Sequence, residues 1–239
     1  MVLYNNNEGH TDMINPHFED VKEFMNTFGQ DVLTTPTLPS PKVGLLRYNL
    51  IEEEADELAE AMLDDDIVET ADALADLLYV IYGAYAAMGL TPGTIPTNNG
   101  PWDDNTIVMP NITESIKINV SLQEDLHRLM NGYKTGEMGK IADSLDGLLT
   151  NVYRFSFECG IDIYKCFDEV HDSNMSKACK TANEATNSIQ MRLNEGKNDY
   201  QGAYIENVGE YYIIKRLADG KTLKGNYYFE PNLKSILGL

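Results

Sequence analysis

Basic residues are scarce in this chain, and one long segment has none. The 239 residues include 18 Lys and Arg against 38 Asp and Glu, which gives a formal net charge of −20. Residues 48–116 contain no Lys or Arg at all. Nonspecific contact with nucleic acid needs a basic surface, so this charge balance excludes a nucleic-acid partner and favours a free ligand.

Cysteine and long apolar runs are also scarce. The three cysteines do not have the spacing of a metal site, and the chain shows no secretory signal peptide, so we expect a cytoplasmic protein in a reducing compartment. The uncharged stretch at residues 77–90 is too short to cross a bilayer and predicts a buried helix. We therefore expect no membrane partner.

Acidic residues are concentrated in two segments with helical periodicity, residues 50–62 and 67–90. In each segment, apolar residues recur at spacings of three and four, and carboxylates lie along the edge of the apolar stripe. The carboxylates that border the predicted core are Glu53, Glu54, Glu57, Glu69, Asp72 and Asp76. The carboxylates that face away from it, Glu52, Asp56 and Glu60, are expected to be solvated.

Such a cluster needs a source of positive charge. Two carboxylates about 4 Å apart repel by ~4 kcal/mol at an effective dielectric constant of about 20, and burial adds to the cost. Arg47 is the one basic residue nearby in the sequence, so neutralisation must come from protonation, water or a metal ion. Oxygen ligands in this number suit Mg2+, or alternatively Mn2+, better than zinc.

These residues resemble a known family. L-I-E-E-E-A-D-E-L at residues 50–58, followed by E-T-A-D-A-L-A-D-L-L-Y-V at 69–80, resembles the all-alpha nucleoside triphosphate pyrophosphohydrolases, which include MazG, dimeric dUTPase and phosphoribosyl-ATP pyrophosphohydrolase. Residues 24–39, 170–177 and 219–233 resemble the phosphoribosyl-ATP pyrophosphohydrolase-like branch. The resemblance implies a mainly α, four-helix-type bundle and a Mg2+-dependent hydrolase that converts a nucleoside triphosphate into a monophosphate and pyrophosphate.

The resemblance also implies roles for individual residues. Glu54 and Glu57 match the metal ligands of the first helix; on the second helix two of Glu69, Asp72 and Asp76 bind metal, and we favour the two aspartates. Glu53 or Glu54 is the expected general base. The expected phosphate or substrate contacts are Asn174, Lys177, His171 and Arg47, and the expected base contacts are Phe28, Thr37 and Pro39.

A segment with weak similarity to the second acidic segment follows it 71 residues later. Residues 71–90 and 142–161 share seven identical pairs out of twenty, which indicates an internal duplication. The copy has lost two of the acids, since Lys140 stands opposite Glu69 and Gly147 opposite Asp76. Asp143, opposite Asp72, is the one that survives and is expected to be structural. We expect a pseudo-dimer with one metal site per chain, existing as a monomer or pairing again as a homodimer.

We expect four parts along the chain. Residues 1–97 hold the N-terminal segment and the catalytic repeat, 98–118 form a loop, 119–180 form the degenerate repeat, and 181–239 form a helix, a loop and a β-hairpin.

Two details of these parts carry further expectations. Trp102, in the loop, could stack on a base, although packing the loop against the bundle is the favoured reading. The expected hairpin pairs residues 211–217 with 222–229 around the turn Asp219-Gly220.

Two other functions fit the same composition. A chain this acidic could be a DNA mimic or another charge-based inhibitor, whose carboxylates would be spread over exposed faces. It could also be a catalytically silent nucleotide sensor on the same fold. The sequence ranks neither the base nor the sugar of the nucleotide.

Overall fold

A computed structural model describes residues 15–93 and 107–239. Trp102 and the expected boundary between residues 97 and 98 lie outside these residues. The described chain is mainly helical with a small antiparallel hairpin, so the expected fold class is confirmed. The elements are α1 (Pro16–Thr27), α2 (Pro41–Leu63), α3 (Ile67–Met88), α4 (Ile112–Thr135), α5 (Met138–Glu158), α6 (Ile163–Met175), α7 (Ala182–Asn194), a 3-10 turn η1 (Asn198–Tyr200), β1 (Tyr204–Val208), β2 (Tyr211–Lys215) and α8 (Leu233–Leu237).

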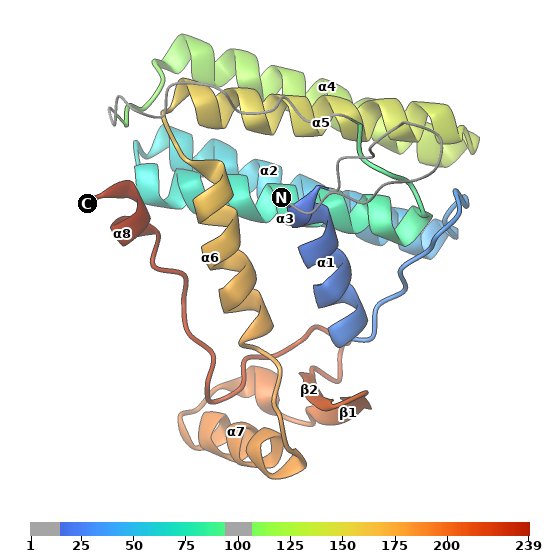
Figure 1. The fold of residues 1–239 in the computed structure, drawn as a ribbon, viewed down its shortest axis with the longest axis vertical. Coiled ribbons are helices and arrows are strands. Elements are labelled where there is room, and N and C mark those ends of the chain that lie inside the picture. Colours follow the sequence, from blue (N-terminus) through green and yellow to red (C-terminus); the bar gives the residue numbers. More distant parts are fainter. Residues whose placement is uncertain (1–14, 94–106) are drawn as a thin grey trace, which may run out of the picture.

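Two helical hairpins, α2–α3 and α4–α5, form the bundle. Figure 1 shows α4 and α5 lying alongside α2 and α3 as a second pair, with α1 and α6 crossing below them. α3 is central, because it packs against α1, α2, α5, α6 and α8. Its residues from Leu77 to Met88 are almost all buried, as the uncharged stretch predicts. None of the described helices combines the length and the apolar character that crossing a bilayer requires.

The turn between α2 and α3 sets the register of the acidic hairpin. Asp65 adopts a φ of 56°, a left-handed conformation that Asp tolerates better than most residues. The Asp66 carboxylate then accepts hydrogen bonds from the backbone N–H groups of Val68 (3.0 Å) and Glu69 (3.1 Å) and caps α3. The run of three aspartates therefore ends one helix and begins the next.

The two hairpins correspond to each other at a constant spacing. The helices α2 and α4 begin at Pro41 and Ile112, and α3 and α5 begin at Ile67 and Met138, so both pairs are offset by the same 71 residues that separate Tyr82 from Tyr153. The buried positions of α2 and α4 also match, and the pairs include Ile51 with Leu122, Ala55 with Leu126, and Leu58 with Leu129. This correspondence is what an internal duplication predicts, although the duplication itself stays a hypothesis.

A small lobe made of α7, η1, β1 and β2 lies beyond the end of α6 (Figure 1). It has its own apolar cluster, which consists of Cys179, Ala185, Tyr200, Ile214 and Leu223. The Lys215 ammonium, on β2, donates a hydrogen bond to the carbonyl oxygen of Phe28 at 3.0 Å, just after α1. This buried contact ties the lobe to the bundle.

The expected hairpin exists, but its predicted pairing is wrong. β2 pairs with β1, which precedes it, and Val208 lies opposite Tyr211 across a two-residue turn. Gly209 opens that turn at a φ of 57°, which glycine adopts at no steric cost. The Asp219 carboxylate instead closes a loop by bonding to Arg216 and to the Lys221 N–H, so residues 222–229 reach β2 only through a bridge between Lys215 and Thr222.

Candidate metal and phosphate site

The carboxylates predicted to bind metal act on one another in the folded chain. Burial, followed by the charges of Asp76 and Glu57, raises the pKa of Glu54 to about 8. Burial, followed by the charge of Asp72, raises the pKa of Asp76 to about 7. The pKa of Asp72 rises to about 6, mainly through burial and then through Glu69 and Glu57. Carboxylates from α2 and α3 therefore share one partly buried place.

Helix geometry explains this convergence. Glu54 and Glu57 are one turn apart on α2, as are Asp72 and Asp76 on α3, and the two helices run antiparallel around a short turn. One oxygen of Glu54, Oε2, is buried without any hydrogen-bond partner. A buried carboxylate oxygen left without a partner costs free energy, so the site has the chemistry of one that receives a cation.

Lys177, just after α6, brings a cation to this cluster. Burial lowers its pKa, the charges of Lys224 and Lys221 act in the same direction, and the charges of Asp76 and Glu54 oppose them. The Lys177 ammonium donates a hydrogen bond to Oδ1 of Asn174 on α6. The two residues expected to contact phosphate therefore lie together beside the acids, although they are a hundred residues downstream.

The carboxylates predicted to bind metal do not lie close enough together to form a complete set of metal ligands. In the part of the chain that the structure describes, one group of His, Cys, Asp or Glu side chains has ligand atoms that all lie within 4.8 Å of one another. It consists of Asp20, Glu23 and His171. The predicted ligands on α2 and α3 do not form such a group. Their hard oxygen donors, the raised pKa values of Glu54 and Asp76, and the unpaired Glu54 oxygen nevertheless suit a divalent ion such as Mg2+.

Sequence reasoning missed Asp20 and Glu23. Nothing local marks them, because they meet His171 only where α1 packs beside α6. Nδ1 of His171 lies 3.1 Å from the hydroxyl oxygen of Tyr79, whose pKa rises well above its usual range through burial and then through Asp20 and Asp76. His171 therefore borders the acidic site, and its expected contact with substrate stays a prediction.

Arg47 lies deeper in the bundle than the acids. Its side chain is 8% exposed, and its Nη2 donates to Oε1 of Gln30 at 3.1 Å. Gly83 makes room for the guanidinium, since a Cβ there would lie 2.9 Å from Nη1 of Arg47. Arg47 precedes Glu54 by two helical turns, about 10 Å along α2, so it lies at the far end of the same helix face.

The expected base contacts are distributed near that end. Phe28 is fully buried against Phe24, with ring centroids 4.3 Å apart. Thr37 is exposed, and its backbone N–H donates to the carbonyl oxygen of Met88 at 2.9 Å. Pro39 is half-buried, and its ring lies 3.5 Å from the position of a Cβ added at Gly44. Contact with a base stays a prediction for all three.

The matching place in the second hairpin holds an ion pair between a buried carboxylate and an exposed guanidinium. Asp125 stands where the first hairpin has Glu54, is 2% exposed, and pairs with Arg128, which replaces Glu57. Nδ2 of Asn151 donates to the same carboxylate at 2.9 Å. Gly147, in place of Asp76, leaves room for Asp125, because a Cβ there would lie 2.6 Å from its Oδ1.

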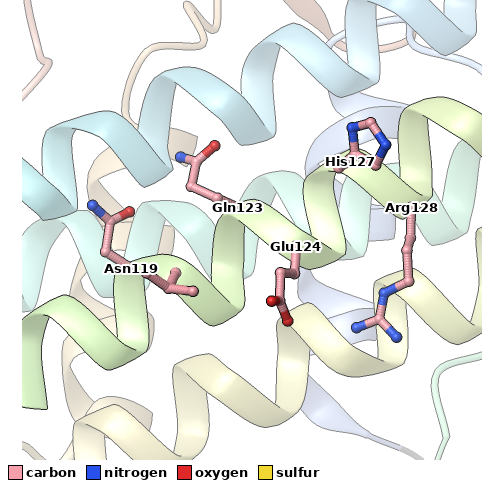
Figure 2. A pocket seen from close by; sticks show the side chains of 6 residues that line it. Asn119, Gln123, Glu124, His127 and Arg128 are labelled. Carbon is pink, nitrogen blue, oxygen red and sulfur yellow. The ribbon is translucent and has the colours of Figure 1, made fainter.

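The face of α4 beside this ion pair differs chemically from that of α2. Figure 2 shows a shallow hollow whose labelled lining residues are Asn119, Gln123, Glu124, His127 and Arg128. At the places where α2 has Glu52, Asp56 and Glu57, α4 has an amide, an imidazole and a guanidinium. In the described chain, this hairpin therefore lacks the acid cluster of the first.

Comparison with known proteins supports the resemblance to the pyrophosphohydrolases that the sequence shows. Residues 21–98 match the family model described as phosphoribosyl-ATP pyrophosphohydrolase, a member of the all-alpha NTP pyrophosphohydrolase superfamily, and they contain all the predicted metal ligands. The chain is also similar to an uncharacterized protein of Acanthamoeba polyphaga mimivirus, with 29% identity over 242 residues that cover 92% of this chain and 95% of that protein. No solved structure matches. The resemblance seen in the sequence is confirmed, and it points to a pyrophosphohydrolase type of activity.

Proposed function

We propose, from the pyrophosphohydrolase match of residues 21–98, that the protein is a Mg2+-dependent nucleoside triphosphate pyrophosphohydrolase. It converts a ribo- or deoxyribonucleoside triphosphate into the monophosphate and pyrophosphate. The observation that carries the proposal is the convergence of the α2 and α3 carboxylates around Lys177, where burial and the charge of Asp76 raise the pKa of Glu54, and burial and the charge of Asp72 raise the pKa of Asp76. Carboxylates whose pKa values are perturbed by burial and by one another are typical of a functional site.

Mg2+, or Mn2+ in its place, would be held by Glu54 and Glu57 from α2 together with Asp72 and Asp76 from α3. Glu69, exposed at the start of α3, borders this set. When bound, the metal neutralises the acids and the phosphates and lowers the pKa of a water molecule. The partnerless Oε2 of Glu54 is the observation that favours such a ligand here.

The remaining residues bind the substrate or accept a proton from the attacking water. Lys177 and Asn174 bind phosphate oxygens, because an ammonium and an amide are both hydrogen-bond donors. Glu53, exposed beside the cluster, or Glu54 accepts a proton from the attacking water. Arg47, about 10 Å along α2 from Glu54, lies at the end where the sugar and base extend.

The rival functions fit the structure less well. A DNA mimic or charge-based inhibitor would spread its carboxylates over exposed surfaces, whereas Glu54 and Asp76 are partly buried and their charges act on Lys177. A catalytically silent nucleotide sensor would share the fold and the binding residues but would not hydrolyse the nucleotide. Turnover is therefore the property to measure.

The test is a panel of nucleoside triphosphates and diphosphates incubated with Mg2+ and assayed for pyrophosphate and monophosphate. Wild type should release pyrophosphate, and Glu54→Gln should lose about 100-fold or more of kcat/KM because it removes a ligand of the metal. Glu60→Gln, an exposed neighbour on α2, is the matched control and should retain wild-type activity. Absence of turnover with every nucleotide, or equal activity of Glu54→Gln and wild type, would contradict the proposal.

A further inference from the structure

The segment at residues 219–232, here called the strap, returns from the C-terminal lobe along α6 (Figure 1). The carbonyl oxygen of Phe229 accepts a hydrogen bond from the Ser173 hydroxyl at 2.8 Å, and the Phe229 N–H donates to the Ser176 hydroxyl at 3.2 Å. The Asn232 N–H donates to Glu169 at 2.8 Å. The strap is therefore fixed against the end of α6 that carries Asn174 and leads to Lys177.

The middle of the strap touches the backbone of Lys177 itself. A Cβ added at Gly225 would lie 3.5 Å from the Lys177 carbonyl oxygen and 2.9 Å from Sγ of Cys179, so only glycine permits this approach. From the lobe side, the Tyr200 hydroxyl donates to the Lys224 carbonyl oxygen at 2.7 Å. Contacts on both sides thus hold the backbone next to Lys224 in place.

Two strap lysines lie near enough to Lys177 for their charges to act on it. The charges of Lys224 and Lys221 both act on Lys177, which in turn feels Asp76 and Glu54. Three ammonium groups therefore gather at one edge of a chain whose net charge is −20. Like charges repel, so an anion bound among these ammonium groups would stabilise the arrangement.

The partners that these strap lysines have in the structure are weak ones. The Lys224 ammonium lies 3.8 Å from Glu230, whose side chain is 82% exposed, and 4.1 Å from the centre of the Tyr228 ring. Lys221 takes part in none of the ion pairs formed among residues 15–93 and 107–239. An exposed ion pair contributes little to stability, so a phosphate can replace Glu230 at small cost.

We propose that Lys177, Lys221 and Lys224 form a clamp for the polyphosphate tail, which makes the enzyme selective for nucleoside triphosphates over diphosphates. This proposal rests on the proposed function for the identity of the reacting phosphate. The oxygen of water forms a bond to the α phosphorus, and the bond from that phosphorus to the α–β bridging oxygen breaks. Pyrophosphate leaves with the bridging oxygen, and the proton of the water passes through Glu53 or Glu54 to solvent. The clamp holds both phosphates of the leaving group, whereas a diphosphate offers it only one.

Binding of inorganic pyrophosphate in Mg2+, measured by isothermal titration calorimetry, tests the clamp without turnover. Lys221→Ala/Lys224→Ala should bind pyrophosphate about 10-fold or more weakly, since it removes two cationic contacts. The charge-matched control is Lys117→Ala/Lys134→Ala on α4, whose side chains are exposed and lie in the second hairpin. Equal weakening in both double variants would show a general charge effect and would overturn the clamp, as would wild type that does not bind pyrophosphate.

Steady-state kinetics distinguish a failure of the clamp proposal from a failure of the proposed function. The ratio of kcat/KM for a triphosphate to that for its diphosphate should fall about 10-fold in Lys221→Ala/Lys224→Ala and should stay constant in the control. An unchanged ratio in an active double variant would overturn the clamp and leave the proposed function standing. Lysine-dependent pyrophosphate binding by a wild-type protein that hydrolyses no nucleotide would overturn the proposed function and support the anion site.

Discussion

The hydroxyl oxygens of Tyr82 and Tyr153 lie 2.7 Å apart inside the bundle, and the two tyrosines occupy equivalent places in the two helical hairpins. A contact between equivalent residues is what a two-fold axis produces in a symmetric dimer. Here both partners belong to one chain. The pair thus lies where the pseudo-symmetry of a duplicated hairpin would place its axis.

This pair makes a prediction for stability. Asn15 donates to the Tyr82 hydroxyl at 2.8 Å, and in the bond between the two tyrosines either hydroxyl can be the donor. Tyr153→Phe should cost about 1–3 kcal/mol, because it removes a hydrogen-bond partner from the buried Tyr82 hydroxyl, and Tyr82→Phe/Tyr153→Phe should cost less than the sum of the single variants. Urea unfolding of all four proteins measures the coupling; strict additivity would argue against the bond.

Asp72 and Asp143 are also equivalent by spacing, but only Asp72 lies among the other acids. Asp72→Asn should abolish pyrophosphate release, by about 100-fold or more, because it removes a metal ligand. Asp143, which is exposed on α5, should tolerate the same substitution with full activity. Similar losses in the two variants would refute the idea of one active site per chain.

The Asp125–Arg128 pair should be required for the stability of the second hairpin. Arg128→Gln leaves the buried Asp125 carboxylate without its cation and should lower the free energy of unfolding by about 1–2 kcal/mol, less than for a fully buried pair because the Arg128 side chain is 64% exposed. Adding Asp125→Asn should restore part of that loss. Arg154→Gln, which breaks an exposed pair with Glu158, is the control and should change stability by less than about 1 kcal/mol.

His17 should make stability depend on pH. Burial lowers its pKa to about 4, with a further contribution from His171; Asp168, 3.4 Å away but 68% exposed, is screened by solvent and does not reverse the shift. Between pH 6.5 and 4 the unfolded chain binds a proton at this residue and the folded chain does not, so stability is lost as the pH falls.

His17→Phe retains the stacking on Phe167 and removes the titration. Wild type should therefore lose about 2 kcal/mol more than this variant between pH 7 and pH 5. Thermal or urea unfolding at the two pH values measures the difference. His127→Phe, at an exposed position on α4, should behave like wild type. Parallel pH profiles for wild type and His17→Phe would contradict the prediction.

Local patterns were enough to predict the bundle and the acidic cluster. Helical periodicity fixes which sides of α2 and α3 are buried, and the short aspartate turn fixes their antiparallel register, so Glu54 and Asp76 could be placed together from sequence. The match between the hairpins could be seen because an offset of 71 residues repeats both the apolar stripe and the closing glycines.

Long-range packing could not be predicted in the same way. Asp20 and Glu23 meet His171 only through the crossing of α1 and α6, for which no local signal exists. The hairpin was assigned to the wrong turn because Asp219-Gly220 has hairpin composition, whereas the Asp219 carboxylate bonds to Arg216 and holds a wider loop. The burial of Arg47 on α2 depends on the space that Gly83 on α3 leaves for its guanidinium.

Hydrolysis of a nucleoside triphosphate in water labelled with oxygen-18 and containing Mg2+ tests the central claim most directly, because it identifies the phosphorus that is attacked. The account predicts that the label enters the nucleoside monophosphate and that the pyrophosphate stays unlabelled, with both products lost in Glu54→Gln. Label in pyrophosphate or in inorganic phosphate, or a diphosphate product, would contradict attack at the α phosphorus by this site.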